Sequence, residues 1–200
     1  MCWNSQSSLT FFILGNMINT IILTLSIINH KYNMIAFCLG WYFVITMQLL
    51  EYFIWSHKNN ESYSFLAYIF NILQILVIYQ SFISISNLYN VHWINKLIAS
   101  IILLYYIFNC FYWTKNNKYN INIKSKHLIY PWWNNKKGLL YLFCLISLFL
   151  LLARPIEWSF IILSLILSLF FLSYIYYRPY VASMWCFFVV LLPIIAYFIY

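Results

Sequence analysis

One acidic side chain, that of Glu51, lies inside a mostly apolar stretch of membrane-spanning length, residues 34–57. Only three acidic residues occur in the chain, and the other two are Glu61 and Glu157. A charge inside a bilayer costs about 2.5–3.5 kcal/mol on insertion scales, so such a residue usually faces a partner or a cavity. A buried carboxyl group can carry a proton, bind a cation or act as a general base. Glu51 is therefore the candidate catalytic residue.

Helical spacing puts two further side chains on the face of Glu51. Gln48 precedes it by three residues and Trp55 follows it by four, and residues three and four apart are neighbours on a helix. A structural alternative exists, because Asn and Gln in membrane helices often only hydrogen-bond to other helices, at about 0.6 kcal/mol on average. A protonated Glu can do the same, since burial favours the neutral form of a carboxyl group. Both interpretations stay open.

The composition excludes a soluble domain. The 200-residue chain is 65% hydrophobic and 23% aromatic, and 7% of its residues are charged, whereas a globular surface needs many more polar side chains. Three glycines and four prolines provide few turns for a β-barrel, and the apolar runs exceed the about 9–11 residues of a transmembrane strand. We therefore predict an all-α, polytopic transmembrane helical bundle that forms a single integral membrane domain, residues 1–200.

The apolar runs predict seven spans. Because a membrane helix needs about 20 apolar residues, we place the spans near 9–29, 34–56, 64–86, 93–113, 138–153, 156–176 and 180–200. The last two breaks are short, at Arg154-Pro155 and Arg178-Pro179, where proline disfavours helix in the residue before it. Six spans are the alternative, if 138–176 forms one re-entrant hairpin. The first run is too long for a cleavable signal peptide and lacks a basic segment before it.

Basic residues predict the orientation, because cytoplasmic loops carry an excess of Lys and Arg. With seven spans, Lys31, Lys96 and Arg154 lie on one side, and the remainder of the 11 basic residues lie on the side of the N-terminus. We therefore predict a cytoplasmic N-terminus and a basic cytoplasmic loop at 114–137 between helices four and five. The net charge of +8 then favours anionic lipid headgroups over nucleic acid as the partner of this loop.

This topology predicts that polar side chains from five segments lie at the depth of Glu51. The segments are the chain before the first span, the second, third and fourth spans, and the beginning of the seventh. Random scatter would place as many polar residues in the outer half, where the sequence has few. The set is Cys2, Trp3, Asn4, Gln48, Glu51, Trp55, Asn71, Gln74, Asn109, Cys110, Ser183, Trp185 and Cys186.

Cysteine and histidine form no metal motif. The five cysteines show no CxxC or CxxH spacing, which would indicate a metal or redox site. Cys2, Glu51, His127 and Cys186 have side chains of the types that zinc accepts, but nothing in their spacing requires a metal. We therefore predict no metal ligand, and the sequence leaves any cofactor unknown.

Several functions of seven-helix proteins are disfavoured. Residues 180–200 contain no Lys for a retinal Schiff base, and the chain contains no Asp for a Ser-His-Asp triad. None of the four histidines lies inside a predicted span, unlike in membrane zinc hydrolases. Repeated halves with helices broken by Gly or Pro, which are typical of carriers, are not detectable.

Four short motifs carry a resemblance to a known family: MCWNSQSS at 1–8, QLLEYFIW at 48–55, HLIYPWW at 127–133 and SMWC at 183–186. They resemble MCW-N-x-x-x-S, Q-x-x-E-Y-F-x-W, H-L-x-W-x-W and S-x-W-C in a family of uncharacterised multi-span membrane proteins of giant DNA viruses. A more distant bacterial group that opens MCF-S-x-x-A-S is also similar. The resemblance implies a virion membrane or a virus-modified host membrane as the location, and it implies no reaction.

The resemblance also implies a site at many of the same residues that are predicted to lie at the depth of Glu51. The central loop departs from the family pattern, because Tyr130-Pro131 stands where a Trp is expected, and this leaves the role of His127 open. The matching positions are Cys2, Trp3, Asn4, Ser8, Gln48, Glu51, Trp55, His127, Trp133, Trp185 and Cys186.

Three functions remain, in order of preference. The first is a non-enzymatic component of a viral or virus-modified host membrane, in which the Glu51 cluster holds the helices together. The second is a membrane-embedded enzyme, or a protein that binds lipid or a small molecule, with a Glu51-centred site at the cytoplasmic leaflet. The third is a proton- or cation-linked transporter. A homo-oligomer is compatible with all three.

Overall fold

The computed structural model is an α-helical bundle, which confirms the predicted fold class. It describes residues 4–57, 61–114, 121–124, 127–130, 136–154, 156–177 and 190–198. Four of its helices are long and apolar enough to cross a membrane, and α5 and α6 contain shorter apolar segments. The helices are α1 (Ser5–Ile28), α2 (Tyr32–Ser56), α3 (Glu61–Leu88), α4 (Trp93–Thr114), α5 (Lys136–Leu152) and α6 (Ile156–Tyr177), and a further helical segment covers 190–198.

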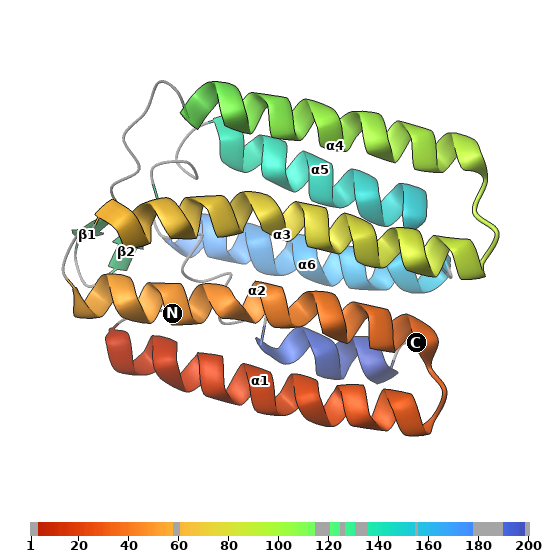
Figure 1. Ribbon diagram of the computed structural model, residues 1–200, viewed down its shortest axis with the longest axis horizontal. Helices are drawn as coiled ribbons and strands as arrows, with labels where there is room; N and C mark the ends of the chain where they lie inside the picture. The colour runs from red at the N-terminus through yellow and green to blue at the C-terminus, as the bar shows by residue number, and fades with distance from the viewer. Residues whose placement is uncertain are drawn as a thin grey trace.

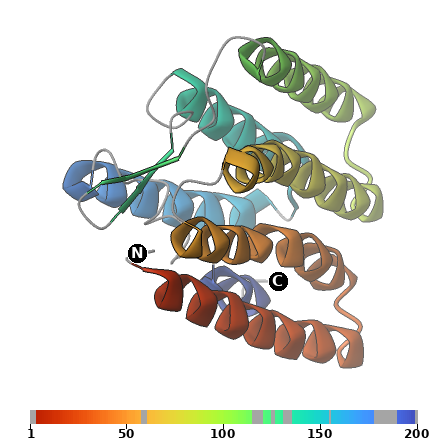
Figure 2. The ribbon, with the colours of Figure 1, turned by 60° about the vertical axis from the view of Figure 1, so that its left-hand side comes forward.

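The helices lie side by side and alternate in direction (Figure 1). Strands β1 (Asn122–Lys124) and β2 (His127–Ile129) lie at the end of the bundle where α1 begins and α2 ends. We term this the hairpin end, and it corresponds to the predicted cytoplasmic side. The opposite end, termed the far end, contains the α1–α2 and α3–α4 turns. Figure 2 brings the hairpin forward and shows it beside the helix ends.

Local chemistry explains where the helices begin and end. At the start of α1, the side-chain oxygen of Asn4 accepts a hydrogen bond from the Ser7 backbone N–H at 2.7 Å, as an N-cap residue does. At the far end, His30 and Asn90 adopt left-handed backbone conformations with φ of 52° and 49°, which Asn and His tolerate better than most residues. The predicted breaks at 30–33 and 87–92 are therefore confirmed as short turns, and the break at 57–62 includes residues outside the described ones.

The outer faces of the peripheral helices are apolar. On α4, Leu104, Phe108 and Phe111 are 66%, 71% and 73% exposed, and on α1 Met17 and Ile21 are also exposed. In water, contiguous apolar surface of this kind marks an interaction site or an aggregation hazard. It is the ordinary surface of a bundle whose solvent is lipid, so the surface agrees with the class that the composition indicates.

Glycine permits close approach of neighbouring helices. A Cβ atom at Gly40 of α2 would lie 2.4 Å from Ser81 Oγ and 3.3 Å from Val77 Cγ1 of α3. A Cβ atom at Gly15 of α1 would lie 3.1 Å from a side-chain carbon of Ile45 in α2. Small residues at such contacts let membrane helices pack backbone to backbone. Two of the three glycines in the chain therefore shape the α1–α2–α3 packing.

Buried polar side chains in the far half of the bundle have local partners. Asn19 of α1 donates from Nδ2 to the carbonyl oxygen of Cys38 in α2 at 2.9 Å. Ser26 and Ser86 donate to carbonyl oxygens of their own helices at 2.6 and 2.8 Å. Each of these hydrogen bonds pairs a single polar atom, and only the one from Asn19 joins two helices, α1 and α2. They therefore stabilise the bundle and do not form a polar path through it.

Tyr197 attaches the helical segment 190–198 to the α1–α2 turn. Asn29 Nδ2 donates to the Tyr197 hydroxyl at 2.7 Å, and Lys31 Nζ donates to the Tyr197 carbonyl oxygen at 3.1 Å. The Lys31 ammonium also lies 4.1 Å from the centre of the Tyr197 ring, a cation–π geometry. Tyr197 therefore lies at the far end while α1 begins at the hairpin end, as an odd number of crossings requires.

We expect Gly40→Ala to destabilise the bundle by about 1–3 kcal/mol, the usual cost of an overpacked contact. The nearest obstacle is Ser81 Oγ, whose hydrogen bond goes to the Val77 carbonyl of its own helix. Ser81→Ala should therefore cost little alone and should restore most of the stability in the double variant. Thermal unfolding in detergent micelles, followed by circular dichroism, measures all three variants. Equal losses for Gly40→Ala with and without Ser81→Ala would contradict this explanation.

Candidate functional site

The carboxyl group of Glu51 is completely buried, and the basic loop supplies its hydrogen-bond donor. Glu51 has 0% of its surface exposed and Tyr130 has 2%. The Tyr130 hydroxyl donates to Glu51 Oε1. Tyr130 directly follows β2, 79 residues away from Glu51 in the sequence. A side chain of the polar loop thus reaches into the end of the helical bundle.

The hairpin places Tyr130 at this position. Its two strands pair antiparallel, with Ile123 opposite Leu128 and Lys124 opposite His127. Leu128 and Tyr130 are both buried, as residues two apart on one strand share a face. The hairpin is also joined to α3, because the Ile121 backbone N–H donates to the buried Ser64 Oγ at 3.3 Å.

An apolar cluster surrounds this contact. It joins α2, the first turns of α3 and the hairpin, and all of its members are buried. Each methylene group that leaves water here contributes about 0.8 kcal/mol, so packing and the Glu51–Tyr130 hydrogen bond act together to hold the hairpin. The members are Met47, Leu50, Ile54, Ala67, Tyr68, Ile121, Leu128 and Tyr130.

Gln48 and Trp55 accompany Glu51 on α2, as the helical spacing predicts. Gln48 is 1% exposed and lies one turn farther into the bundle. Trp55 is half-buried and packs against the apolar cluster that contains Leu128 and Tyr130. Its indole N–H group is enclosed and has no hydrogen-bond partner among the described residues. A buried donor one turn from a carboxyl group is a feature that a bound small molecule could use.

The other predicted polar residues divide into two levels. Two stacked ring pairs show how α2 and α3 lie against each other: the ring centres of Phe43 and Phe70 are 4.7 Å apart, and those of Phe53 and Tyr63 are 5.4 Å apart. Because α2 and α3 run in opposite directions, Glu51 lies at the level of about residue 65 of α3. Asn71 and Gln74 therefore lie roughly 9–14 Å farther along α3, at 1.5 Å per residue.

The deeper level has its own hydrogen bonds. Gln74 Oε1 accepts from Asn71 Nδ2 at 3.5 Å and from the Tyr141 hydroxyl of α5 at 3.3 Å. Tyr68 donates to the carbonyl oxygen of Cys110 at 3.0 Å, and Asn109 bonds its own helix at 2.8 Å. The structure thus joins Glu51 to Tyr130, with Gln48 and Trp55 one turn away on either side along α2, and it joins Asn71 and Gln74 to Tyr141 farther along α3.

Asn4 has a local role, because its described contacts are those of the α1 cap. Four predicted site residues, Cys2, Trp3, Trp185 and Cys186, lie outside the described residues, and His127 is described by its backbone in β2 alone. Within the described ranges, no three His, Cys, Asp or Glu side chains gather as a metal site.

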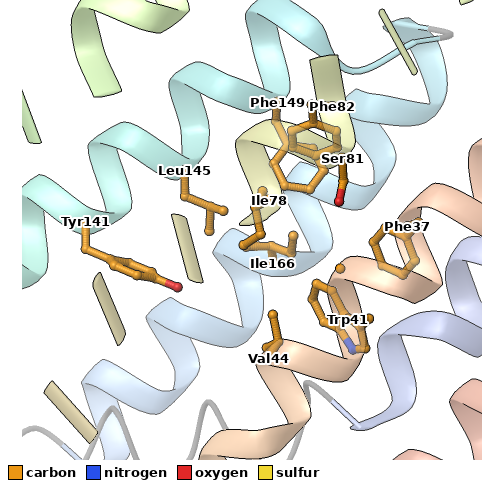
Figure 3. Close-up of a pocket in the computed structure, with 11 residues that line it drawn as sticks. Phe37, Trp41, Val44, Ile78, Ser81, Phe82, Tyr141, Leu145, Phe149 and Ile166 are labelled. Atoms are coloured by element: carbon orange, nitrogen blue, oxygen red, sulfur yellow. The ribbon is translucent and has the colours of Figure 1, made fainter. Parts of the chain in front are cut away.

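The described cavity is not at Glu51. It lies between α2, α3, α5 and α6, and its lining includes Trp41, Val44 and Ile166 (Figure 3). Glu51, Gln48 and Tyr130 do not line it. The carboxyl group is completely buried, so a substrate meets it only after one of the surrounding segments moves.

The fold and this site define a polytopic α-helical bundle of the membrane type, with a buried carboxyl–phenol contact at one end. No family model matches the chain, and no curated protein or solved structure shows significant similarity to it.

Tyr130 is the site residue that the motifs did not single out. No signal in the sequence marked it, because Ile129 is as apolar as its neighbour Leu128 and residues 127–130 are too few to show the period of a strand. The structure shows that Tyr130 puts a hydroxyl group within hydrogen-bonding reach of Glu51.

We expect Tyr130→Phe to release the hairpin. A lost hydrogen bond to a charged or buried polar group costs about 1.5–3 kcal/mol, and 1.4 kcal/mol is a factor of ten in an equilibrium. Trypsin cleaves after lysine, and Lys124 lies in β1. Cleavage after Lys124 should become about tenfold faster or more, because it follows the population of the opened hairpin. Mass spectrometry of timed digests in micelles measures the rate.

Tyr105→Phe is the matched control, because Tyr105 is 59% exposed on α4 and loses the same hydroxyl group away from the hairpin. Its cleavage rate should equal that of the unmodified protein. An equal rate for Tyr130→Phe would show that the Glu51–Tyr130 hydrogen bond does not hold the hairpin.

Proposed function

We propose that this chain is a non-enzymatic, multi-pass integral membrane protein in which Glu51 fixes a basic loop across one end of the helical bundle. The observation that carries this proposal is the complete burial of Glu51 together with its hydrogen bond from Tyr130. A general base or a cation ligand has to meet its substrate, whereas this carboxyl group is completely buried and accepts a hydrogen bond from Tyr130 of the loop. The contact therefore favours an architectural role.

The loop is the part of the protein that a partner would meet. The stretch 114–137 contains six lysines, Lys115, Lys118, Lys124, Lys126, Lys136 and Lys137. Each basic residue near an anionic membrane surface contributes about 1 kcal/mol of attraction. Docking of the hairpin on α2 and α3 keeps this charge close to the bundle end, where lipid headgroups lie. We infer that anionic headgroups of the cytoplasmic leaflet are its partner.

The location follows from the sequence resemblance. The MCWN, QLLEYFIW and SMWC motifs support a virion membrane or a virus-modified host membrane. In that setting the protein is a membrane component that presents a basic surface to the cytoplasmic side.

A second candidate, a membrane-embedded enzyme or small-molecule-binding protein, is favoured by one observation. The enclosed Trp55 N–H lies one turn from Glu51 without a partner among the described residues, so it could donate to a ligand that enters when the hairpin opens. In this case Glu51 would be the base and its charge would be essential.

Substitution of Glu51 separates these two functions. Glu51→Gln keeps an oxygen acceptor for the Tyr130 hydroxyl and removes the charge, whereas Glu51→Ala removes both. For an architectural role we expect trypsin cleavage after Lys124 to stay near the original rate in Glu51→Gln and to rise about tenfold in Glu51→Ala, as for a lost hydrogen bond of about 1.4 kcal/mol.

The double variant Glu51→Ala, Tyr130→Phe provides the control. Because each single change removes the same hydrogen bond, the one between Tyr130 and Glu51, the double change should open the hairpin little more than either change alone. A Glu51→Gln protein that opens as readily as Glu51→Ala would contradict an architectural role in which Glu51 only supplies an oxygen acceptor to Tyr130.

The predicted orientation has its own test. Trypsin added to intact cells that express the protein should leave 114–137 uncut, because this loop is predicted on the cytoplasmic side by the positive-inside rule. Permeabilisation should permit cleavage after the loop lysines. Cleavage in intact cells would reverse the orientation and remove the inner leaflet as the source of the anionic partner.

A further inference from the structure

A cavity lies near the middle of the bundle, between the α2–α3 pair and the α5–α6 pair (Figure 3). Val44 lines it from the centre of α2 (Tyr32–Ser56), and Ile166 lines it from the centre of α6 (Ile156–Tyr177). The cavity is therefore at the level of the hydrocarbon core if the helices span a bilayer. It is separate from the Glu51 site, whose residues do not line it.

The walls of the cavity are apolar. Aromatic and aliphatic side chains such as Trp41, Leu145 and Ile166 form most of the lining. Its hydroxyl groups already have partners, because Ser81 donates to the Val77 carbonyl at 3.0 Å and Tyr141 donates to Gln74 at 3.3 Å. A trapped water needs about 2–4 polar partners, so these walls suit hydrocarbon better than water.

The size of the cavity limits what it can hold. The space open to the centre of a water-sized sphere is about 30 Å³, and a single water needs about 10–15 Å³ of such space. About two atoms of methylene size therefore fit. This is too small for a lipid headgroup or a ring and is suited to the end of an alkyl chain.

The wall of the cavity between α2 and α6 consists of side chains. Among the described residues, α6 has close backbone contacts with α5 and none with α2, although both α2 and α6 line the cavity. Their buried side chains belong to one apolar core, and a chain end that enters between α2 and α6 therefore has to displace side chains rather than a closely packed backbone.

We propose that this cavity binds the terminal segment of a lipid acyl chain. An unfilled apolar cavity forfeits dispersion contacts of its lining atoms, and the cost rises by about 24 cal/mol for each Å³ of residual cavity. In a bilayer the solvent is itself hydrocarbon, so a chain end fills the space without leaving water. The protein then has an acyl chain as part of its packed interior.

Trp41 supplies the means to test this proposal. Its side chain is 7% exposed and lines the cavity, so lipid reaches its ring only from inside the bundle. The protein is reconstituted in phosphatidylcholine vesicles whose acyl chains carry bromine near the terminal methyl group. Bromine quenches tryptophan fluorescence on contact. The difference in emission between the protein and its Trp41→Phe variant isolates Trp41 from the other tryptophans.

We expect brominated chains to remove most of the emission that Trp41 contributes, and Val44→Phe, which fills the cavity, to restore it. Leu104→Trp in the Trp41→Phe protein is the positive control, because Leu104 is 66% exposed on α4 and meets the surrounding lipid directly. Quenching of this control without quenching of Trp41 would overturn the proposal.

A second comparison does not depend on Trp41→Phe folding. Val44→Phe alone should lower the quenching of total fluorescence by brominated lipid, whereas Leu104→Phe, a substitution to the same residue on the lipid-facing surface, should leave it unchanged. Quenching that is identical in both variants and in the unmodified protein would also overturn the proposal.

Discussion

A carboxyl group inside hydrocarbon must obtain its hydrogen bonds from the protein, and the hairpin end of the bundle is organised around this requirement. Water is not at hand to solvate Glu51, which is fully buried on α2, so a donor has to come from another segment. Tyr130 provides it, and a stretch that is polar by composition consequently folds back onto the helices. The apolar side chains of Leu128 and Ile121 then exclude solvent from the contact.

The sequence predicts the helices well and the site only partly, because helix ends depend on contacts between neighbours in the chain and the site depends on contacts between distant segments. Helix ends depend on neighbours in the chain, such as the caps and turns at Asn4, His30 and Asn90, so continuity of apolar residues was sufficient. Burial of Glu51 followed from its place within an apolar run. Its partner Tyr130 is 79 residues away and follows strands of three residues, which are too short to show a period. Depth alone also placed Asn71 and Gln74 with Glu51, whereas helix packing separates them.

Close packing and imperfect packing occur side by side in the middle of the bundle. Gly40 brings the α2 and α3 backbones together, and the same glycine lines the cavity. A residue without a side chain permits the approach and contributes no atoms to fill the adjoining space. Rigid aromatic rings such as Phe37 and Trp41, which stack at 4.8 Å, cannot deform to occupy it. The cavity is thus a consequence of how α2 and α3 come together.

The contact of Tyr197 with Asn29 and Lys31 has a consequence for biosynthesis. The hydrogen bond joins residues 168 positions apart, and a ribosome adds about 5–20 residues per second. The α1–α2 pair therefore waits for roughly ten to thirty seconds before its partner emerges. During that interval the ammonium group of Lys31 lacks the Tyr197 carbonyl and ring that it contacts in the folded bundle. Assembly of the bundle is completed by a late-made segment that docks on the earliest-made pair of helices.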